Sequence, residues 1–144
     1  MVLSIVTINF NDKKGLEKTI HSVKKLKSFF ENEVEHIIID GKSDDGSAEL
    51  LSEYINNPKI IIEKDNGPCD ALNKGINASE GSHILFLNSG DYLNPALTFR
   101  EYSNLIESLG KNRNTALVAS VKNIDIQKTI KPPAADDIRS LSMI

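Results

Sequence analysis

The strongest indication of the fold of this 144-residue chain is the segment His36-Ile37-Ile38-Ile39, which is followed by the polar loop Asp40–Ser47. Three consecutive isoleucines are typical of a short buried strand, and the Gly, Asp and Ser residues after them are typical of a loop. The same succession of an apolar run and a polar loop occurs at residues 3–12, 59–67 and 83–91. Strands this apolar are usually covered on both faces, which favours a parallel sheet.

Amphipathic segments separate these apolar runs. Between residues 13 and 30, apolar side chains recur every three or four positions, which predicts a helix with one buried face. Further helices are predicted at 48–55, 69–78 and 95–109. Strands are predicted at 3–8, 36–40, 59–63, 83–88 and 115–121, with 124–130 as a sixth candidate. Strand and helix alternate, so the expected fold class is α/β, a mostly parallel sheet flanked by helices.

Composition excludes several classes of function. With 17 Lys+Arg, 20 Asp+Glu and a net charge of −3, the chain lacks the basic face that nucleic-acid binding needs, so no nucleic-acid partner is expected. The single Cys69 excludes a disulfide framework. No apolar run approaches the roughly 18 residues of a membrane span. The first residues lack a basic segment and lead directly into a strand, so we expect a cytoplasmic location.

Ligands of parallel α/β sheets bind at the carboxyl ends of the strands, where this chain carries acidic loops. Asp40 and Asp91 follow strands, while Asp65 and Asp70 flank a turn. No phosphate-binding P-loop and no glycine-rich dinucleotide motif is present. Carboxylates that converge at one sheet edge favour a hard divalent cation together with a phosphate-bearing ligand. For each of these residues, turn formation or helix capping is the alternative explanation.

Four ordered blocks stand at the strand ends and the loops after them, namely Ser4-Ile5-Val6-Thr7-Ile8-Asn9-Phe10-Asn11, Ile38-Ile39-Asp40-Gly41-Lys42-Ser43-Asp44-Asp45-Gly46-Ser47, Glu63-Lys64-Asp65-Asn66-Gly67-Pro68-Cys69-Asp70-Ala71-Leu72-Asn73-Lys74-Gly75 and Phe86-Leu87-Asn88-Ser89-Gly90-Asp91. These blocks resemble family 2 glycosyltransferases, and most of all the bacterial exopolysaccharide and colanic-acid type. The resemblance covers residues 3 to about 130 and implies a GT-A (Rossmann-like) fold. It implies transfer of a sugar from a nucleotide-sugar donor, a UDP-sugar, to a saccharide or lipid-linked acceptor in bacterial polysaccharide biosynthesis.

The resemblance also implies roles for individual residues. Thr7 and Phe10 lie in the block that lines the base pocket, and Phe10 stands where the family usually has Tyr. Asp40 matches the aspartate that accepts a hydrogen bond from the uracil N–H. Asp91 matches the aspartate that binds Mn or Mg, while Gly90 stands where many members have a further Asp. Three more positions match the blocks near the base, ribose and diphosphate: Asp65, Asp70 and Lys74.

The resemblance implies a division of the chain as well. Residues 1–130 are the expected nucleotide-sugar-binding GT-A domain, and 131–144 are a tail leading to an absent acceptor region, so we expect a fold truncated at its C-terminal side. In the family that region carries the general base, so the catalytic residue is not assigned in this chain. The alternative function is therefore a truncated or inactive nucleotide-sugar-binding module that binds UDP weakly and transfers no sugar. Exposed apolar surface would then favour a homo-oligomer.

The sequence leaves two further alternatives open, one for the role of the first helix and one for the class of protein. The lysine-rich face of the first helix is explained by solvation, or by peripheral contact with the inner face of the membrane, where lipid-linked acceptors lie. A phosphoacceptor signalling domain has a similar length. That class requires an acidic pair after the first strand, whereas residues 9–12 supply only Asp12.

Overall fold

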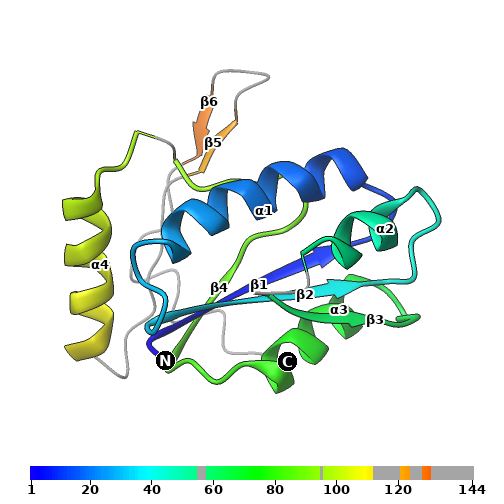
Figure 1. The fold of residues 1–144 in the computed structure, drawn as a ribbon, viewed down its shortest axis with the longest axis horizontal. Coiled ribbons are helices and arrows are strands. Elements are labelled where there is room, and N and C mark those ends of the chain that lie inside the picture. Colours follow the sequence, from blue (N-terminus) through cyan, green and yellow to red (C-terminus); the bar gives the residue numbers. More distant parts are fainter. Residues whose placement is uncertain (55–57, 95, 112–120, 124–127, 131–144) are drawn as a thin grey trace. The chain divides into compact units, whose positions relative to one another are not determined.

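The computed structural model describes residues 1–54, 58–94, 96–111, 121–123 and 128–130. The chain forms two compact units, residues 1–113 and 114–144. In the first unit, four strands form one sheet in which every neighbouring pair is parallel (Figure 1). In spatial order these are β3 (Lys59–Ile62), β2 (Val34–Asp40), β1 (Leu3–Asn9) and β4 (His83–Phe86). The predicted mostly parallel α/β fold is confirmed.

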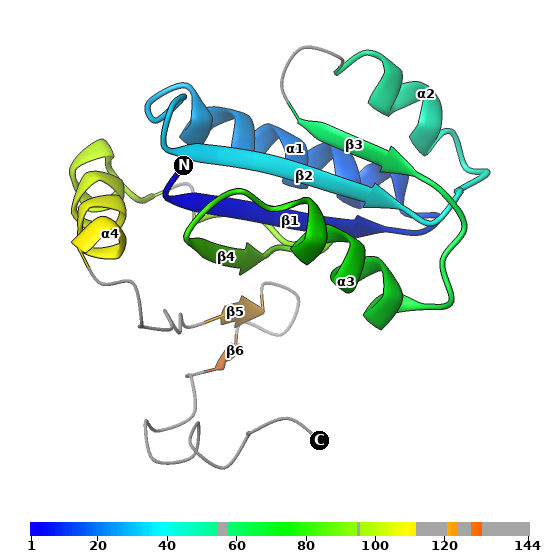
Figure 2. The same ribbon diagram turned by 90° about the horizontal axis from the view of Figure 1, so that it is seen from below.

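Helices cover both faces of this sheet (Figure 2). On one face, α1 (Lys13–Lys27) and α2 (Ser47–Ser52) pack against β2 through an apolar cluster that includes Leu16 and Ile38. On the other face, α3 (Pro68–Ala78) packs against β1 and β2 through Ala71. None of the helices in the described ranges combines the length and the apolar content of a bilayer-spanning segment.

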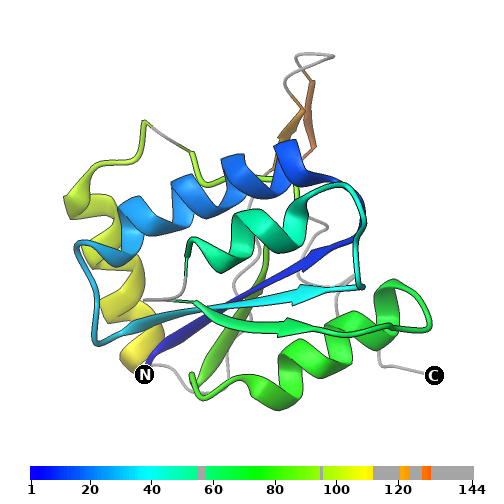
Figure 3. The same cartoon turned by 45° about the vertical axis from the view of Figure 1, so that its right-hand side comes forward.

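The strand order creates a topological switch point between β1 and β4. The chain proceeds from β1 outward to β2 and β3, and then returns through α3 to the opposite side of β1. Figure 3 shows that β1, β2 and β3 all end at the same side of the sheet, where α1, α2 and α3 begin. In open α/β sheets, ligands bind in the crevice at this end, so the topology indicates where to look for a site.

Backbone pairing continues beyond the end of β4. The Leu87 N–H donates to the Val6 carbonyl at 2.9 Å, and the Ser89 N–H donates to the Ile8 carbonyl at 3.1 Å. The segment predicted as a strand over 83–88 therefore follows β1 almost to the end of that strand. This pairing brings the loop after β4 beside the loop after β1.

Two helix boundaries differ from the prediction. The first helix ends at Lys27, and Phe30 lies in the following turn, where its ring stacks on Phe99 with the centroids 5.5 Å apart. The fourth helix, α4 (Phe99–Lys111), begins later than the predicted residue 95. Thr98 and Glu101 form a capping box there, because the Thr98 N–H donates to Glu101 Oε2 at 2.7 Å and Thr98 Oγ1 accepts from the Glu101 N–H at 3.3 Å.

The second unit contains a short antiparallel pair, β5 (Val121–Asn123) with β6 (Lys128–Ile130). The predicted strand at 115–121 lies outside the described residues except for Val121, which pairs with Ile130. Val121 lies in a strand as predicted, and it pairs antiparallel with β6, which falls within the predicted sixth strand at 124–130. The tail 131–144 lies outside the described residues, and the proposed domain of 1–130 stays a prediction.

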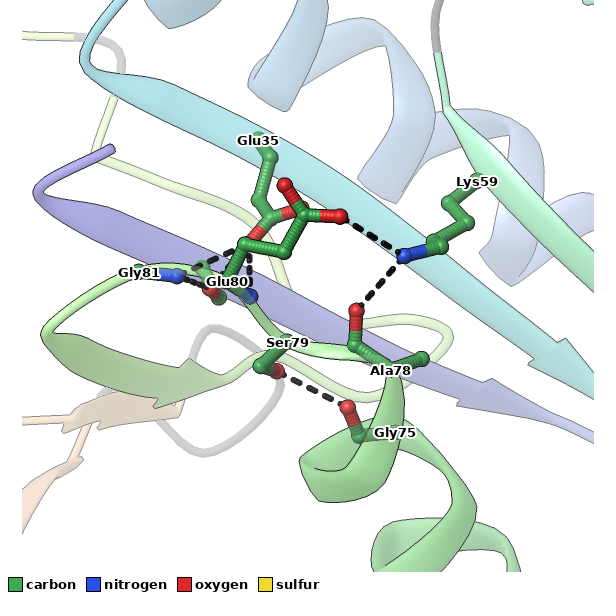
Figure 4. A network of polar contacts seen from close by, with 8 residues as sticks. Glu35, Lys59, Gly75, Ala78, Ser79, Glu80 and Gly81 are labelled. Atoms are coloured by element: carbon green, nitrogen blue, oxygen red, sulfur yellow. Dashed lines mark hydrogen bonds and ion pairs between the residues drawn. The ribbon is translucent and has the colours of Figure 1, made fainter.

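A polar network ties the elements together at the amino end of the sheet (Figure 4). The Glu35 carboxylate accepts hydrogen bonds from the Ser4 hydroxyl and from the backbone N–H groups of Glu80 and Gly81. Lys59 forms an ion pair with Glu80 at 3.2 Å. Partial burial opposes the charge on Glu35, but these hydrogen bonds keep the pKa of its carboxyl below the ordinary value. The network joins α3 and β4 to the other strands.

A second buried polar pair lies within the sheet. The His36 ring is almost fully buried, and its Nε2 lies 2.9 Å from the Thr7 hydroxyl. Burial first, and then the nearby Lys27 ammonium, lower the pKa of His36 to about 3. His36 is therefore neutral in the folded chain at physiological pH, whereas it would protonate near pH 6.5 in the unfolded chain.

We expect the free energy of unfolding to fall as the pH is lowered from 7 to 5. Below pH 6.5 the unfolded chain binds a proton that the folded chain does not, so the slope approaches about 1.4 kcal/mol per pH unit. Urea denaturation at several pH values measures this slope. His36→Asn should flatten it and His21→Asn, at an exposed position of α1, should not; equal slopes for wild type and His36→Asn would contradict the prediction.

Candidate functional site

A pocket of about 720 Å³ lies at the carboxyl ends of the strands. Residues from the loops after all four strands line it, together with the first turn of α3. It coincides with the switch point between β1 and β4, where the topology predicts a ligand site. The lining residues are Ile8, Asn9, Phe10, Asp12, Gly41, Lys42, Lys64, Asp65, Gly67, Pro68, Ala71, Asn88 and Ser89.

Asp40, the last residue of β2, does not line this pocket. Its side chain is completely buried, and both oxygens accept hydrogen bonds from neighbouring residues. Oδ1 accepts from the Ser43 backbone N–H at 2.8 Å, and Oδ2 accepts from Asn9 Nδ2 at 2.7 Å and from Ser43 Oγ at 2.8 Å. The carboxylate thus joins the ends of β1 and β2, and its predicted contact with a base stays a prediction.

Further hydrogen bonds connect the loop after β1 to the loop after β2. The Asn11 N–H donates to Ser43 Oγ at 2.9 Å, and the Asp44 N–H donates to Asn11 Oδ1 at 2.9 Å. Asp45 accepts from the Lys13 N–H at 2.7 Å, at the beginning of α1. The Ser47 hydroxyl is the main cause, ahead of the Lys13 N–H, that the pKa of Asp45 lies below its ordinary value. These contacts hold one wall of the pocket in a defined shape.

Two of the predicted nucleotide-binding residues line the pocket, namely Phe10 and Asp65. The Phe10 ring follows β1 directly and is 66% exposed, so a flat face remains available for a ligand. Asp65 belongs to the turn before α3, where its Oδ1 accepts from the Gly67 N–H at 3.0 Å. Gly67 has a φ of 113°, a backbone conformation that favours glycine and that shapes this turn.

Asp70 and Lys74 lie together on α3, outside the lining of the pocket. Lys74 Nζ lies 3.6 Å from Asp70 Oδ2 and 3.0 Å from Glu63 Oε1, and it also donates to the Lys64 carbonyl at 2.9 Å. The Asn66 N–H contributes most to keeping the pKa of Asp70 below its ordinary value. Both side chains therefore connect the end of β3 to α3, and their predicted nucleotide contacts remain untested.

Thr7 also lies outside the lining of the pocket. It belongs to β1, where successive side chains point to opposite faces of the sheet. Its hydroxyl contacts the buried His36 ring, whereas the pocket takes Ile8, Asn9 and Phe10 from the end of the strand. The sequence block identified the correct loop, but Thr7 lies two residues before the end of β1, is completely buried and does not line the pocket.

Asp91, the predicted metal ligand, lies in the loop after β4. Its backbone carbonyl accepts from Thr19 Oγ1 at 2.6 Å, and the same hydroxyl accepts from the Gly90 N–H at 3.1 Å, so α1 holds this loop. The Asp91 carboxylate is exposed and has no ion pair or hydrogen bond with any residue that the structure describes. The described residues contain no group of three or more His, Cys, Asp or Glu able to hold a metal. One free carboxylate fits a Mg²⁺ or Mn²⁺ ion that takes its other ligands from phosphate oxygens.

Sequence reasoning missed several residues of the pocket. Lys42 and Lys64 both line it, are exposed, and form no ion pair within the described part of the chain. Lys42 has a φ of 67°, which is uncommon for a residue other than glycine. The side-chain oxygens Asn9 Oδ1 and Ser89 Oγ are buried at the pocket and have no hydrogen-bond partner among the residues that the structure describes. Lysines in two of the polar loops were a signal that the sequence contained.

Comparison with known proteins identifies the family. The model of glycosyl transferase family 2 matches residues 4–140, almost the whole chain. The chain belongs to this family. Over 92 residues it is 38% identical to an uncharacterized glycosyltransferase of Mycobacterium tuberculosis, covering 62% of this chain and 34% of that protein. It is 29% identical over 94 residues to a putative teichuronic acid biosynthesis glycosyltransferase of Bacillus subtilis, covering 62% and 36%.

Solved structures support the GT-A fold of this family 2 chain. TarS residues 1–349 from S. aureus, crystallised with UDP-GlcNAc, match with a TM-score of 0.62 at 24% identity, over 75% of this chain and 32% of that one. A mannosyltransferase of Pyrobaculum calidifontis, in complex with GDP-Man and Mn²⁺, matches with a TM-score of 0.61 at 14% identity, over 74% and 31%. The chain thus spans about a third of the length of each of these proteins.

We expect Asp40→Asn to destabilise the fold. Both oxygens of Asp40 accept hydrogen bonds, and the substitution removes their charge and replaces one of them by an NH₂ group, which cannot accept. The free energy of unfolding should therefore fall by about 1.5–3 kcal/mol. Urea denaturation followed by circular dichroism measures the change. Asp44→Asn, at an exposed position of the same loop, is the matched control and should leave the stability unchanged. An Asp40→Asn chain as stable as wild type would show that the buried contacts contribute little.

Proposed function

We propose that this chain is the nucleotide-sugar-binding part of a family 2 glycosyltransferase. The enzyme transfers a sugar from a UDP-sugar donor to a saccharide or lipid-linked acceptor in bacterial cell-wall polysaccharide synthesis. Relatives named for teichuronic acid biosynthesis and for poly(ribitol-phosphate) modification support this setting. A lipid-linked acceptor would bring the enzyme to the cytoplasmic face of the membrane.

The pocket at the switch point between β1 and β4 is the main support for this proposal. It combines the exposed Phe10 ring with the ammonium groups of Lys42 and Lys64, which have no ion-pair partner among the described residues. A nucleoside diphosphate needs both features, because its base is flat and apolar on its faces while its diphosphate is anionic. In our proposal the base stacks on Phe10 and the two lysines approach the diphosphate.

A divalent cation completes the proposed donor site. Asp91 would hold Mn²⁺ or Mg²⁺ with its free carboxylate, and phosphate oxygens would supply further ligands. When bound, the ion neutralises charge on the diphosphate leaving group as a Lewis acid. Asp91 has the chemistry for this role because no described residue occupies its oxygens.

Sugar transfer also requires a general base. In an inverting displacement, a carboxylate takes the proton of the acceptor hydroxyl on the side of the sugar opposite the diphosphate. The carboxylates that line the pocket are Asp12 and Asp65, and Asp12 Oδ1 already accepts from the Gly15 N–H at 3.0 Å to cap α1. Asp136 and Asp137 lie outside the described residues. The alternative proposal is a module that binds the donor without turnover.

Replacement of Phe10 tests the proposed base site. Base stacking on an aromatic ring contributes about 1–3 kcal/mol, so Phe10→Ala should weaken UDP binding about five- to 150-fold. Isothermal titration calorimetry with UDP and Mn²⁺ measures the affinity. Phe29→Ala is the control, because Phe29 is also exposed but packs edge-on against Phe99 and does not line the pocket. Equal losses in both variants would argue against a base stacked on Phe10.

Binding of Mn²⁺ tests the role of Asp91. With one protein carboxylate available, the chain alone should bind Mn²⁺ weakly, and UDP should strengthen this binding. Electron paramagnetic resonance of free Mn²⁺ reports the bound fraction. Asp91→Asn should abolish the effect of UDP, while Glu17→Gln, at an exposed position of α1, should retain it. Tight Mn²⁺ binding without UDP would instead indicate a preformed site.

A second measurement separates the enzyme from the binding module. Release of UDP from UDP-sugars, measured with and without saccharide or lipid-linked acceptors, reports turnover. Release that depends on the acceptor would support the enzyme. UDP binding without release would support the module.

A further inference from the structure

The backbone at Gly41 does not require glycine, but the space around it does. Gly41 follows β2 directly, is buried, and has no positive φ, so an ordinary residue could adopt its conformation. A Cβ atom at this position would lie 2.7 Å from Asp65 Oδ2 and 3.1 Å from Cδ2 of the Phe10 ring. The absence of a side chain at residue 41 therefore lets the Asp65 carboxylate and the Phe10 ring approach the same point in the pocket.

The Asp65 carboxylate is oriented by its own turn. Its Oδ1 accepts from the Gly67 N–H, which holds the group in place. Its Oδ2, the atom that faces Gly41, has no hydrogen-bond donor among the residues that the structure describes. One fixed acceptor atom is thus presented next to an exposed aromatic ring.

Asp40 does not line the pocket. Its two oxygens are buried and accept three hydrogen bonds from Asn9 and Ser43. Its replacement in the pocket is Asp65, which reaches the end of β2 from the turn after β3 because Gly41 leaves the space open.

We propose that Asp65 Oδ2, placed by Gly41, accepts the hydrogen bond from the N3–H group of uracil and selects the base of the donor. This rests on the proposed function and specifies which residue reads the base. Cytosine and adenine present an unprotonated ring nitrogen at the equivalent position, which a carboxylate would repel. Guanine presents two adjacent donors, whereas only one oxygen of Asp65 is available. A single acceptor matches the single N–H donor of uracil.

A comparison of UDP with 3-methyl-UDP tests the assignment, because the methyl group removes the N3 donor. The 144-residue chain with Mn²⁺ should bind UDP about ten- to a hundredfold more tightly than 3-methyl-UDP, as expected for one hydrogen bond to a charged group. Asp65→Ala should weaken UDP binding by a similar factor and should bind both nucleotides equally. Asp65→Asn keeps an oxygen for Gly67 and offers an amide NH₂, so it should prefer CDP to UDP.

Gly41→Ala provides an independent variant in which Asp65 is retained. Its methyl group should displace the carboxylate and remove the preference for UDP over 3-methyl-UDP. Asp44→Asn is the control and should keep that preference, and thermal unfolding by circular dichroism verifies that each variant folds.

The outcomes distinguish this inference from the proposed function. Tight UDP binding with no effect of N3 methylation, or with the preference intact in Asp65→Ala, would overturn the role of Asp65 while leaving the donor site standing. A preference for GDP over UDP would also overturn it. Failure of the wild-type chain to bind any nucleoside diphosphate would overturn both proposals.

Discussion

The buried carboxylate of Asp40 is the contact on which the site depends. It joins the last residue of β1 to the loop after β2 through Asn9 and Ser43, so the two loops cannot move independently. Parallel strands end side by side at one edge of the sheet, but their loops would otherwise lack a fixed arrangement. A carboxylate without access to water keeps the hydrogen bonds to its donors, because a buried charge without partners would cost much free energy. Phe10 follows Asn9 in the chain and Gly41 follows Asp40, so the hydrogen bonds between Asn9 and Asp40 help to position these two pocket residues.

Polar groups at the two ends of the sheet perform different tasks. At the amino end, Glu35 accepts from the backbone at the start of β4, and no ligand is needed to satisfy it. At the carboxyl end, Asn9 Oδ1 and Ser89 Oγ are buried without partners, and Lys42 and Lys64 lack ion pairs in the described part of the chain. Such incomplete pairing is expected where a protein is arranged to bind something other than itself. The same topology explains why the free groups gather at one end, because all four strands run in the same direction.

Much of the fold was predictable from the sequence. The isoleucines of β2 and the helical spacing of Leu16 and Ile20 are local signals, and the structure confirms the elements that they predicted. The helix boundaries were less predictable. The sequence predicted that the fourth helix begins at Pro95, whereas α4 begins after the capping box of Thr98 and Glu101. Val121 pairs antiparallel with Ile130, and the composition of a strand alone does not determine which strand it pairs with.

The site shows the same division between local pattern and tertiary contact. Local patterns in the sequence were enough to predict which loops form the pocket, because an acidic or glycine-rich segment after a strand can be recognised locally and parallel strands bring such segments together. Which side chains of those loops line the pocket depends on contacts between distant residues. Thr7 is buried within β1 beside His36, the Asp40 oxygens accept hydrogen bonds from Asn9 and Ser43, and Lys74 pairs with Glu63 and Asp70. Asp65 reaches the pocket because residue 41 lacks a Cβ atom. Gly41 and Asp65 are 24 positions apart in the sequence, so no local pattern of residues predicts that they lie close together.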